Sequence, residues 1–227
     1  MLYQFISSIL GVKDKEYSYF QTHIHEAIEL NQKRLLQYAE LSQNESKKIS
    51  RMLIRNEKLT LWLALYFDYK AKFFHKNNIP ILKDIFVSMN CIPAFQEGAD
   101  KFDRTQTPIL LNAKSIKVEI RNAYSQGSFL EVYKTCKAIN AKLKYPQYNC
   151  MLRHLIESME RISYFAPQYI EQAKKNNLPS PKKLFKRLLF IHLVAIGKAF
   201  KIDNMAYPLQ KKGILILCND LPNLSVD

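Results

Sequence analysis

The sequence predicts an all-α protein of seven to eight helices. A long N-terminal helical hairpin is expected first, followed by packed helix pairs. Apolar residues recur at spacings of three and four along most of the 227 residues, which is the period of an amphipathic helix. Sequences typical of helix N-termini precede several of these segments. The chain also has only 5 glycines against 9 prolines, which is atypical of turn-rich sandwiches, barrels and propellers.

The first 75 residues predict a short helix followed by the hairpin. Residues 2–10 carry apolar side chains on one helical face and precede a glycine. A helical period then covers 14–43, and Ser42-Gln43-Asn44-Glu45 matches a capping box that opens a second helix reaching residue 75. A helix of about 30 residues is about 45 Å long, close to the diameter of a domain of this size. The two long helices are therefore expected to lie antiparallel.

A less regular stretch separates two predicted subdomains. Residues 81–90 follow a proline and predict one more helix, whereas 93–107 contain proline, glycine and acidic residues and predict an irregular connection. The expected division is an N-terminal helical hairpin subdomain over 1–92 and a C-terminal helical subdomain over 108–227. A chain of 227 residues also suits a single domain.

Start and stop signals divide the C-terminal half into helices. Thr107-Pro108 predicts an N-cap and a first turn, and Gly127 ends that helix. Ser128-Phe129-Leu130-Glu131 is a second capping box, which opens a helix reaching about residue 144.

Further helical segments are predicted beyond residue 148. The first covers 149–165, and Pro167 begins a separate short segment that ends near residue 177. Ser180-Pro181 then caps a helix to about residue 201. The apolar run 214–218 is assigned to a helix as well, since no other segment offers it a strand partner.

Residues 120–146, IRNAYSQGSFLEVYKTCKAINAKLKYP, resemble one helix hairpin of a tetratricopeptide repeat. Gly127 occupies the turn, and Phe129 and Glu131 follow it. The stretch departs from the repeat by one missing residue before the glycine and by Val132 where a small residue is usual, and no second copy follows at the period of the repeat. The resemblance covers about an eighth of the chain and implies stacked helix pairs rather than membership of the family.

The chain carries a formal charge of +14, which favours anionic partners such as acidic proteins, nucleic acids or anionic membrane surfaces. Its longest nearly uncharged runs, 59–67 and 188–197, are shorter than the roughly 20 residues of a spanning helix, so no transmembrane segment is expected. The N-terminus lacks the basic region and cleavage site of a secretory signal. The expected location is therefore cytoplasmic, or reached without a cleaved signal peptide.

No motif of a known catalytic or cofactor chemistry occurs in the sequence. His25 with Glu29, and Cys150 with His154, have the i, i+4 spacing of two ligands on one helical face, but each pair is only half of a metal site. The cysteines show no paired spacing and are expected to be buried, reduced thiols. We therefore expect no catalytic residue, no cofactor and no bound metal.

Positive charge gathers in two places, which we call the first and second basic clusters. In the first, four cations recur along the second long helix at spacings of four, four and three. In the second, four cations occupy the first two turns of a helix, where the helix dipole disfavours them. The candidate residues for binding an anionic partner are Lys47, Arg51, Arg55 and Lys58, and Lys182, Lys183, Lys186 and Arg187. A solvated charged surface is the alternative interpretation of both clusters.

These observations favour a non-enzymatic, helical protein–protein interaction module, such as an adaptor, a chaperone-like factor or an accessory subunit of a larger assembly. Its expected partner is a protein with an acidic surface. The alternative is a helical nucleic-acid-binding protein that uses the basic faces. A third hypothesis is a bacterial effector, or a small helical enzyme whose active site leaves no sequence signature.

Overall fold

The computed structural model describes residues 9, 17–86, 112–143 and 148–212, with the backbone alone over 33–46. Within these ranges the chain is helical and contains no strand, which confirms the all-α class but does not test the predicted number of helices. The described helices are α2 (Tyr19–His75), α4 (Ala113–Ser125), α5 (Phe129–Lys142), α6 (Cys150–Lys175) and α7 (Lys182–Lys211). None of them pairs sufficient length with sufficient apolarity for a membrane span.

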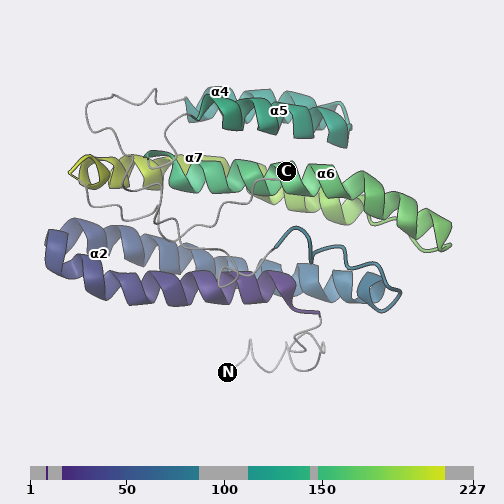
Figure 1. Cartoon of the computed structure of the whole chain (residues 1–227), viewed down its shortest axis with the longest axis horizontal. Helices are drawn as coiled ribbons and strands as arrows, with labels where there is room; N and C mark the ends of the chain where they lie inside the picture. The colour runs from purple at the N-terminus through teal and green to yellow at the C-terminus, as the bar shows by residue number, and fades with distance from the viewer. Residues whose placement is uncertain (1–8, 10–16, 87–111, 144–147, 213–227) are drawn as a thin grey trace.

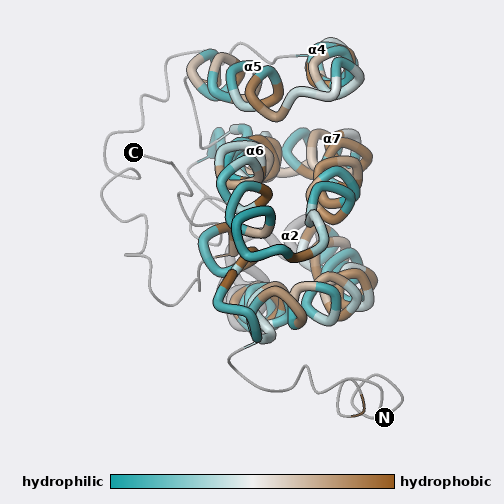
Figure 2. The backbone as a smooth tube through the Cα atoms, turned by 90° about the vertical axis from the view of Figure 1, so that its right-hand side faces the viewer, coloured by the Kyte–Doolittle hydropathy of each residue, from teal (hydrophilic) through white to brown (hydrophobic). Residues whose placement is uncertain are grey.

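The helices are arranged in three layers (Figures 1 and 2). The α4–α5 pair forms one outer layer, α6 and α7 pack against each other in the middle, and α2 forms the other outer layer. Helix α7 contacts both α2 and α4, so it joins the two outer layers.

Helix α2 folds back on itself. Its 57 residues are assigned as one helix, which would be about 86 Å long if it were straight. Nevertheless, the backbone N–H of Phe20 donates to Asp68 Oδ1 at 3.0 Å, and Asn31 Nδ2 donates to Glu57 Oε1 at 2.6 Å. The two ends of α2 therefore lie side by side and antiparallel (Figure 1). The predicted capping box at 42–45 lies inside α2, where the structure describes only the backbone.

One main hydrophobic core connects the layers. Large side chains that are at most 1% exposed come from α2, α4, α5, α6 and α7, as Phe67, Ile120, Ile139, Ile156 and Leu188 show. Burying one such side chain stabilises the folded state by about 1.5–3 kcal/mol. A smaller cluster joins α2 to the start of α6 and the end of α7, and comprises Ile49, Leu53, Cys150, Ile202, Ala206 and Leu209.

The segment after α2 is a compact turn rather than the predicted helix over 81–90. Residues 81–86 form turns, and the positive φ of Asn78 (61°) redirects the chain beforehand. Tyr169 and Arg161 of α6 hold this segment by donating hydrogen bonds to the side chain and the backbone carbonyl of Asp84. Residues 87–90 of the predicted helix lie outside the described residues.

Side-chain caps open α4 and α5. The predicted cap at Ser128 is confirmed, because its Oγ accepts the Glu131 N–H at 3.3 Å. Gly127, with φ of +74°, forms the turn before it, as the sequence predicts. Helix α4 differs from prediction, because its N-cap is Asn112, which accepts the Lys114 N–H at 2.8 Å. The predicted cap at Thr107 lies outside the described residues.

Helices α6 and α7 are longer than predicted. The expected break at Pro167 is wrong, because α6 continues through this proline to Lys175. The helix loses only the hydrogen bond that the residue 167 amide would donate, and buried side chains on both sides of Pro167, Ala166 and Tyr169, keep it packed. Helix α7 likewise continues past residue 201 to Lys211 and includes Pro208. The predicted segments 2–10, 93–107 and 214–218 lie mainly or wholly outside the described residues.

Replacing Pro167 with alanine is expected to stabilise the protein by about 2 kcal/mol. The side chain is exposed, so little packing is lost, and alanine restores an amide that can donate to the Ser163 carbonyl. The greater flexibility of the unfolded alanine variant offsets part of this gain. Chemical denaturation measures the change, and Gln168→Ala, an exposed neighbour, serves as the control with a change below about 0.5 kcal/mol. A destabilised Pro167→Ala variant would contradict this account of α6.

Two buried aspartates replace ordinary N-caps. The side chains at the N-cap positions of α2 and α6 make no capping hydrogen bond. Instead, Asp68 accepts the N–H groups of Phe20 and Gln21 at 3.0 and 2.8 Å. Asp203 of α7 accepts those of Met151 and Leu152, both at 2.9 Å. Burial raises the pKa of each aspartate to about 7, although the backbone N–H groups act in the opposite direction.

Candidate functional site

A cavity of about 330 Å³ lies between the two antiparallel parts of α2, α6 and α7. Bundles of facing helices commonly place ligand sites in such a position. Its interior includes the buried side chains of Phe20, Ile24, Leu53, Phe86 and Ile202. Its opening lies between α2 and α7, because the lining residues Leu59, Leu63, Val194 and Lys198 are exposed to solvent there.

Histidines from three helices meet at this cavity. The rings of His23 (α2) and His154 (α6) stack with centroids 5.7 Å apart and an interplanar angle of 5°. The ring of Phe86 lies 5.5 Å from His23 and 6.5 Å from His192 of α7, also between centroids. No sequence pattern indicates this convergence, because the histidines are far apart along the chain.

His192 is neutral at physiological pH. Burial lowers its pKa to about 4, and the proximity of His23 contributes in the same direction. Its Nδ1 lies 2.8 Å from the Leu188 carbonyl oxygen. Because a carbonyl only accepts, Nδ1 carries the proton and donates, and Nε2 of the neutral ring is a hydrogen-bond acceptor.

In the part of the chain that the structure describes, the three histidines are not grouped with carboxylates or thiols as metal ligands. Among the described residues there is no group of three or more His, Cys, Asp or Glu side chains suited to an ion. His25 and Glu29 lie exposed on α2. Cys150 packs in the smaller core cluster, 3.8 Å from Gln210 Nε2, whereas His154 lines the cavity. Both described cysteines, Cys136 and Cys150, are buried, and burial raises the pKa of Cys136 above the usual range.

The first basic cluster lies beside the opening of the cavity. Arg51, Arg55 and Lys58 are exposed on α2, and Lys47 is partly exposed. The first three of these residues line a shallow hollow of about 340 Å³ together with Ile54 and Leu59. Leu59 lines both the hollow and the cavity, so the cationic hollow borders the apolar cavity.

The second basic cluster is divided between two sides of α7. Arg187 donates a hydrogen bond to the Tyr66 hydroxyl of α2. Lys186 instead points toward the α4–α5 turn, where its Nζ would lie 3.9 Å from a Cβ added to Gly127. Lys182 and Lys183 are exposed, and helical spacing places Lys182 on the side of Lys186 and Lys183 on the side of Arg187. Lys186 and Arg187 therefore face different neighbours, the α4–α5 turn and α2.

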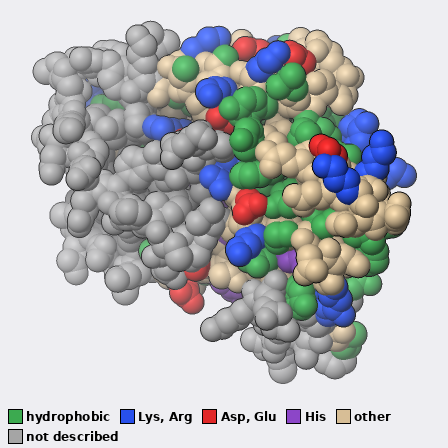
Figure 3. Space-filling view, turned by 45° about the vertical axis from the view of Figure 1, so that its right-hand side comes forward, with side chains coloured by type: hydrophobic (Ala, Val, Ile, Leu, Met, Phe, Trp, Pro, Cys, Tyr) green, Lys and Arg blue, Asp and Glu red, His purple; other side chains and the backbone are tan. Residues whose placement is uncertain are grey.

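Large apolar side chains are exposed along α2 and α7. They follow one stripe of each helix, and the Arg187–Tyr66 hydrogen bond connects the two helices at these stripes. We call this surface the α2–α7 face, and it comprises Leu59, Trp62, Leu63, Tyr69 and Phe73 of α2 with Phe190 and Val194 of α7. On the side of the molecule shown in Figure 3, hydrophobic side chains are interspersed with Lys and Arg.

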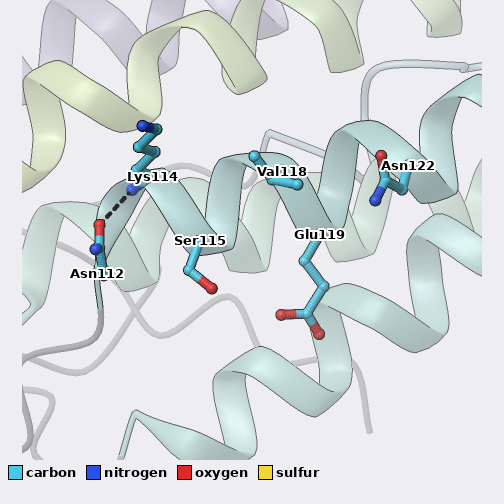
Figure 4. Close-up of a pocket in the computed structure, with 6 residues that line it drawn as sticks. All are labelled: Asn112, Lys114, Ser115, Val118, Glu119 and Asn122. Carbon is cyan, nitrogen blue, oxygen red and sulfur yellow. Dashed lines mark hydrogen bonds between the residues drawn. The ribbon is translucent and has the colours of Figure 1, made fainter.

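A third hollow, of about 520 Å³, follows the outer surface of α4 (Figure 4). The described residues that line it all belong to α4 or its N-cap, and the charged ones among them are Lys114 and Glu119. Ser115 and Glu119 point to one side of the helix and Lys114 to the other. Because a single helix supplies the lining and its charged side chains diverge, this hollow offers no converging set of functional groups.

Comparisons of the chain with protein-family models, curated proteins and solved structures find no match. The features of the described residues that bear on function are the cavity, the cationic hollow and the α2–α7 face.

Proposed function

We propose that the chain is a non-enzymatic, helical protein–protein interaction module that binds an acidic, amphipathic segment of a partner on the α2–α7 face. This makes it an adaptor, a chaperone-like factor or an accessory subunit. The observation that carries the proposal is the pair of exposed apolar stripes, which include Phe73 at 47% and Phe190 at 53% exposure.

The composition of the α2–α7 face is typical of a protein interface. Isolated exposed apolar residues are common, but a contiguous set on two neighbouring helices indicates a contact surface. Tyr, Trp, Phe and Arg are the residue types enriched in interfaces and in their binding hot spots. Trp62, Phe73, Phe190 and Arg187 therefore supply suitable anchors.

The charge around the face favours an acidic partner. Residues 58–73 of α2 and 182–201 of α7 together contain one acid, Asp68, and nine Lys or Arg residues, of which all but Lys182 and Lys186 lie away from the α4–α5 side of α7. Asp68 is fully buried and binds backbone amides, so it presents no negative charge to a partner. A docked acidic segment would experience attraction from both helices, which increases the association rate and the selectivity for such partners.

Substitution of exposed aromatic residues tests the proposal. The variant Phe73→Ser/Phe190→Ser is expected to weaken binding of the native partner by at least about tenfold, because each lost anchor removes buried apolar area. The partner is first isolated with the tagged full chain, and its affinity for purified variants is then measured by interferometry. Val118→Ser/Leu130→Ser is the matched control, because these residues of α4 and α5 are equally exposed, at 48% and 55%, but lie outside the face.

Charge reversal on α7 distinguishes the two sides of the second basic cluster. Lys183→Glu/Arg187→Glu is expected to abolish salt-sensitive binding, whereas Lys182→Glu/Lys186→Glu is expected to retain it. Both variants place glutamate in the first two turns of the helix, which is neutral or slightly favourable for stability. Equal effects of the two reversals, or a loss of binding in the Val118→Ser/Leu130→Ser control, would contradict docking on the α2–α7 face.

Nucleic-acid binding is the second candidate function, and one observation favours it. The Lys70 ammonium lies over the rings of Tyr66 and Tyr69, at 5.9 and 5.4 Å from their centroids, next to exposed Trp62 and Phe73. Cations interleaved with exposed aromatic rings are typical of single-strand-binding surfaces. Fluorescence anisotropy with a labelled oligonucleotide separates the two functions. Tight binding that is lost in Phe73→Ser/Phe190→Ser would replace protein docking with nucleic-acid binding.

A further inference from the structure

The cavity and the cationic hollow together form an amphiphilic site. The cavity is lined mainly by apolar side chains of α2, α6 and α7, with three histidines and Glu57 among its polar groups, and the adjoining hollow carries three exposed cations. Leu59 lines both, and Lys198 adds a further cation at the opening of the cavity. A ligand that spans the two would need an apolar part and an anionic part.

The size of the cavity limits the apolar part. A water molecule occupies about 30 Å³ in the liquid, so a cavity of about 330 Å³ holds about eleven groups of that size. A methylene group is similar in size, so the cavity suits a chain of about ten carbons. Its volume also lies at the lower end of the range for small-molecule sites, which is about 300–1,000 Å³.

The charges place the anionic part at the opening rather than inside. The Glu57 carboxylate lines the cavity, with Oε1 accepting a hydrogen bond from Asn31, and it would repel an anion from the interior. His192, a buried lining residue, is neutral and provides no compensating charge. At the opening, however, Arg55 and Lys58 lie beside Leu59 and attract an anion.

We propose that this site binds a free, single-chain carboxylate of about ten carbons, with its tail in the cavity and its carboxylate against Arg55 and Lys58. This goes beyond the proposed docking function, because it concerns a small molecule bound inside the helical bundle. A bilayer phospholipid is not the proposed ligand, since the cavity is too small for two acyl chains of ordinary length.

Isothermal titration calorimetry of the full chain with decanoate, decanol and decyltrimethylammonium, each below its micelle concentration, tests the head-group preference. We expect decanoate to bind with one-to-one stoichiometry. Decanol is expected to bind about tenfold more weakly, because its head group is uncharged and forms no ion pair with the cations of the hollow. The cationic amphiphile is expected not to bind measurably, because these cations repel it. Absence of decanoate binding, or a preference for the cationic amphiphile, would overturn the proposal.

Two kinds of variant locate the tail and the head. Ala195→Phe introduces a ring at a residue that lines the cavity and is expected to abolish decanoate binding. Ala27→Met, at another lining residue, provides a second test if the first variant does not fold. Arg55→Glu/Lys58→Glu is expected to lower the affinity for decanoate about tenfold and to leave the affinity for decanol nearly unchanged. Its matched control is Arg121→Glu/Lys174→Glu, which makes the same change in charge at exposed residues of α4 and α6.

The results distinguish this site from the docking function and from a membrane surface. Phe73→Ser/Phe190→Ser is expected to bind decanoate normally, since neither residue lines the cavity. If the cavity variants fold and bind decanoate like the wild type, the proposed decanoate site is wrong. The result for the protein partner would not be affected. Preferential binding to vesicles of anionic phospholipid, with no response to free decanoate, would replace the proposed ligand with a membrane surface.

Discussion

Replacing Asp203 with alanine is expected to lower the free energy of unfolding by about 3–5 kcal/mol. The carboxylate accepts the N–H groups of Met151 and Leu152 at the start of α6, and it is 1% exposed. Without it, these amides have no acceptor in the first turn of the helix, and an unsatisfied buried polar group costs about 1–3 kcal/mol. Urea denaturation followed by circular dichroism measures the loss.

Two further substitutions define the cause of this loss. Asp203→Asn retains one carbonyl oxygen of the pair and is expected to lose about half as much stability as Asp203→Ala. Asn204→Ala, at the exposed neighbouring residue, is expected to change stability by less than about 0.5 kcal/mol. An Asp203→Ala variant that loses less than about 1 kcal/mol would show that the carboxylate does not cap α6. The same reasoning applies to Asp68 and the start of α2.

The second large effect is a dependence of stability on pH between about 4 and 7. In the folded state the pKa of Asp68 and of Asp203 is about 7, against about 3.9 in the unfolded chain. The folded state thus binds more protons in this range, so the contribution of each aspartate to stability falls as pH rises. His192, with a folded pKa of about 4 against about 6.5 unfolded, has the opposite effect, and its contribution rises with pH.

Variants separate these opposing contributions. When the folded and unfolded states differ by one bound proton, the free energy of unfolding changes by about 1.4 kcal/mol per pH unit. Between about pH 4.5 and 6.5, the free energy of unfolding of His192→Gln is expected to fall more steeply with rising pH than that of the wild type. The difference in slope is about 1.4 kcal/mol per pH unit. Asp68→Asn/Asp203→Asn is expected to shift the slope in the opposite direction by about twice as much. Urea titrations at half-unit pH intervals measure the slopes, and equal slopes in all three proteins would contradict the assignment.

The local features of the fold could be predicted from the sequence. The cap at Ser128 and the turn at Gly127 follow from neighbouring residues, and the structure has both. The apolar residues at helical spacing, such as Ile120 and Ile156, are fully buried. These signals act within one or two helical turns, so a single sequence contains all the information that they require.

Features that depend on tertiary contacts could not be predicted. Pro167 indicates a break, yet the packing of α6 on both sides keeps the helix continuous. Asp68 and Asp203 occur within helical segments, and nothing near them in the sequence indicates that each caps another helix segment. The candidate site shows the same limit. The first basic cluster follows from its spacing, but the meeting of His23, His154 and His192 requires the packed bundle.

The two buried aspartates also affect which parts of the chain open together. Each lies 47 to 52 residues from the amides that it binds. The end turns of most helices fray first and exchange their amide hydrogens rapidly. At the start of α6, however, the amides of Met151 and Leu152 become free only when α7 separates from α6, so their exchange is tied to a cooperative opening that involves both helices. Hydrogen exchange at these two amides should therefore be as slow as in the middle of the helix, and α6 should fray at its N-terminus in a fragment that ends before residue 203.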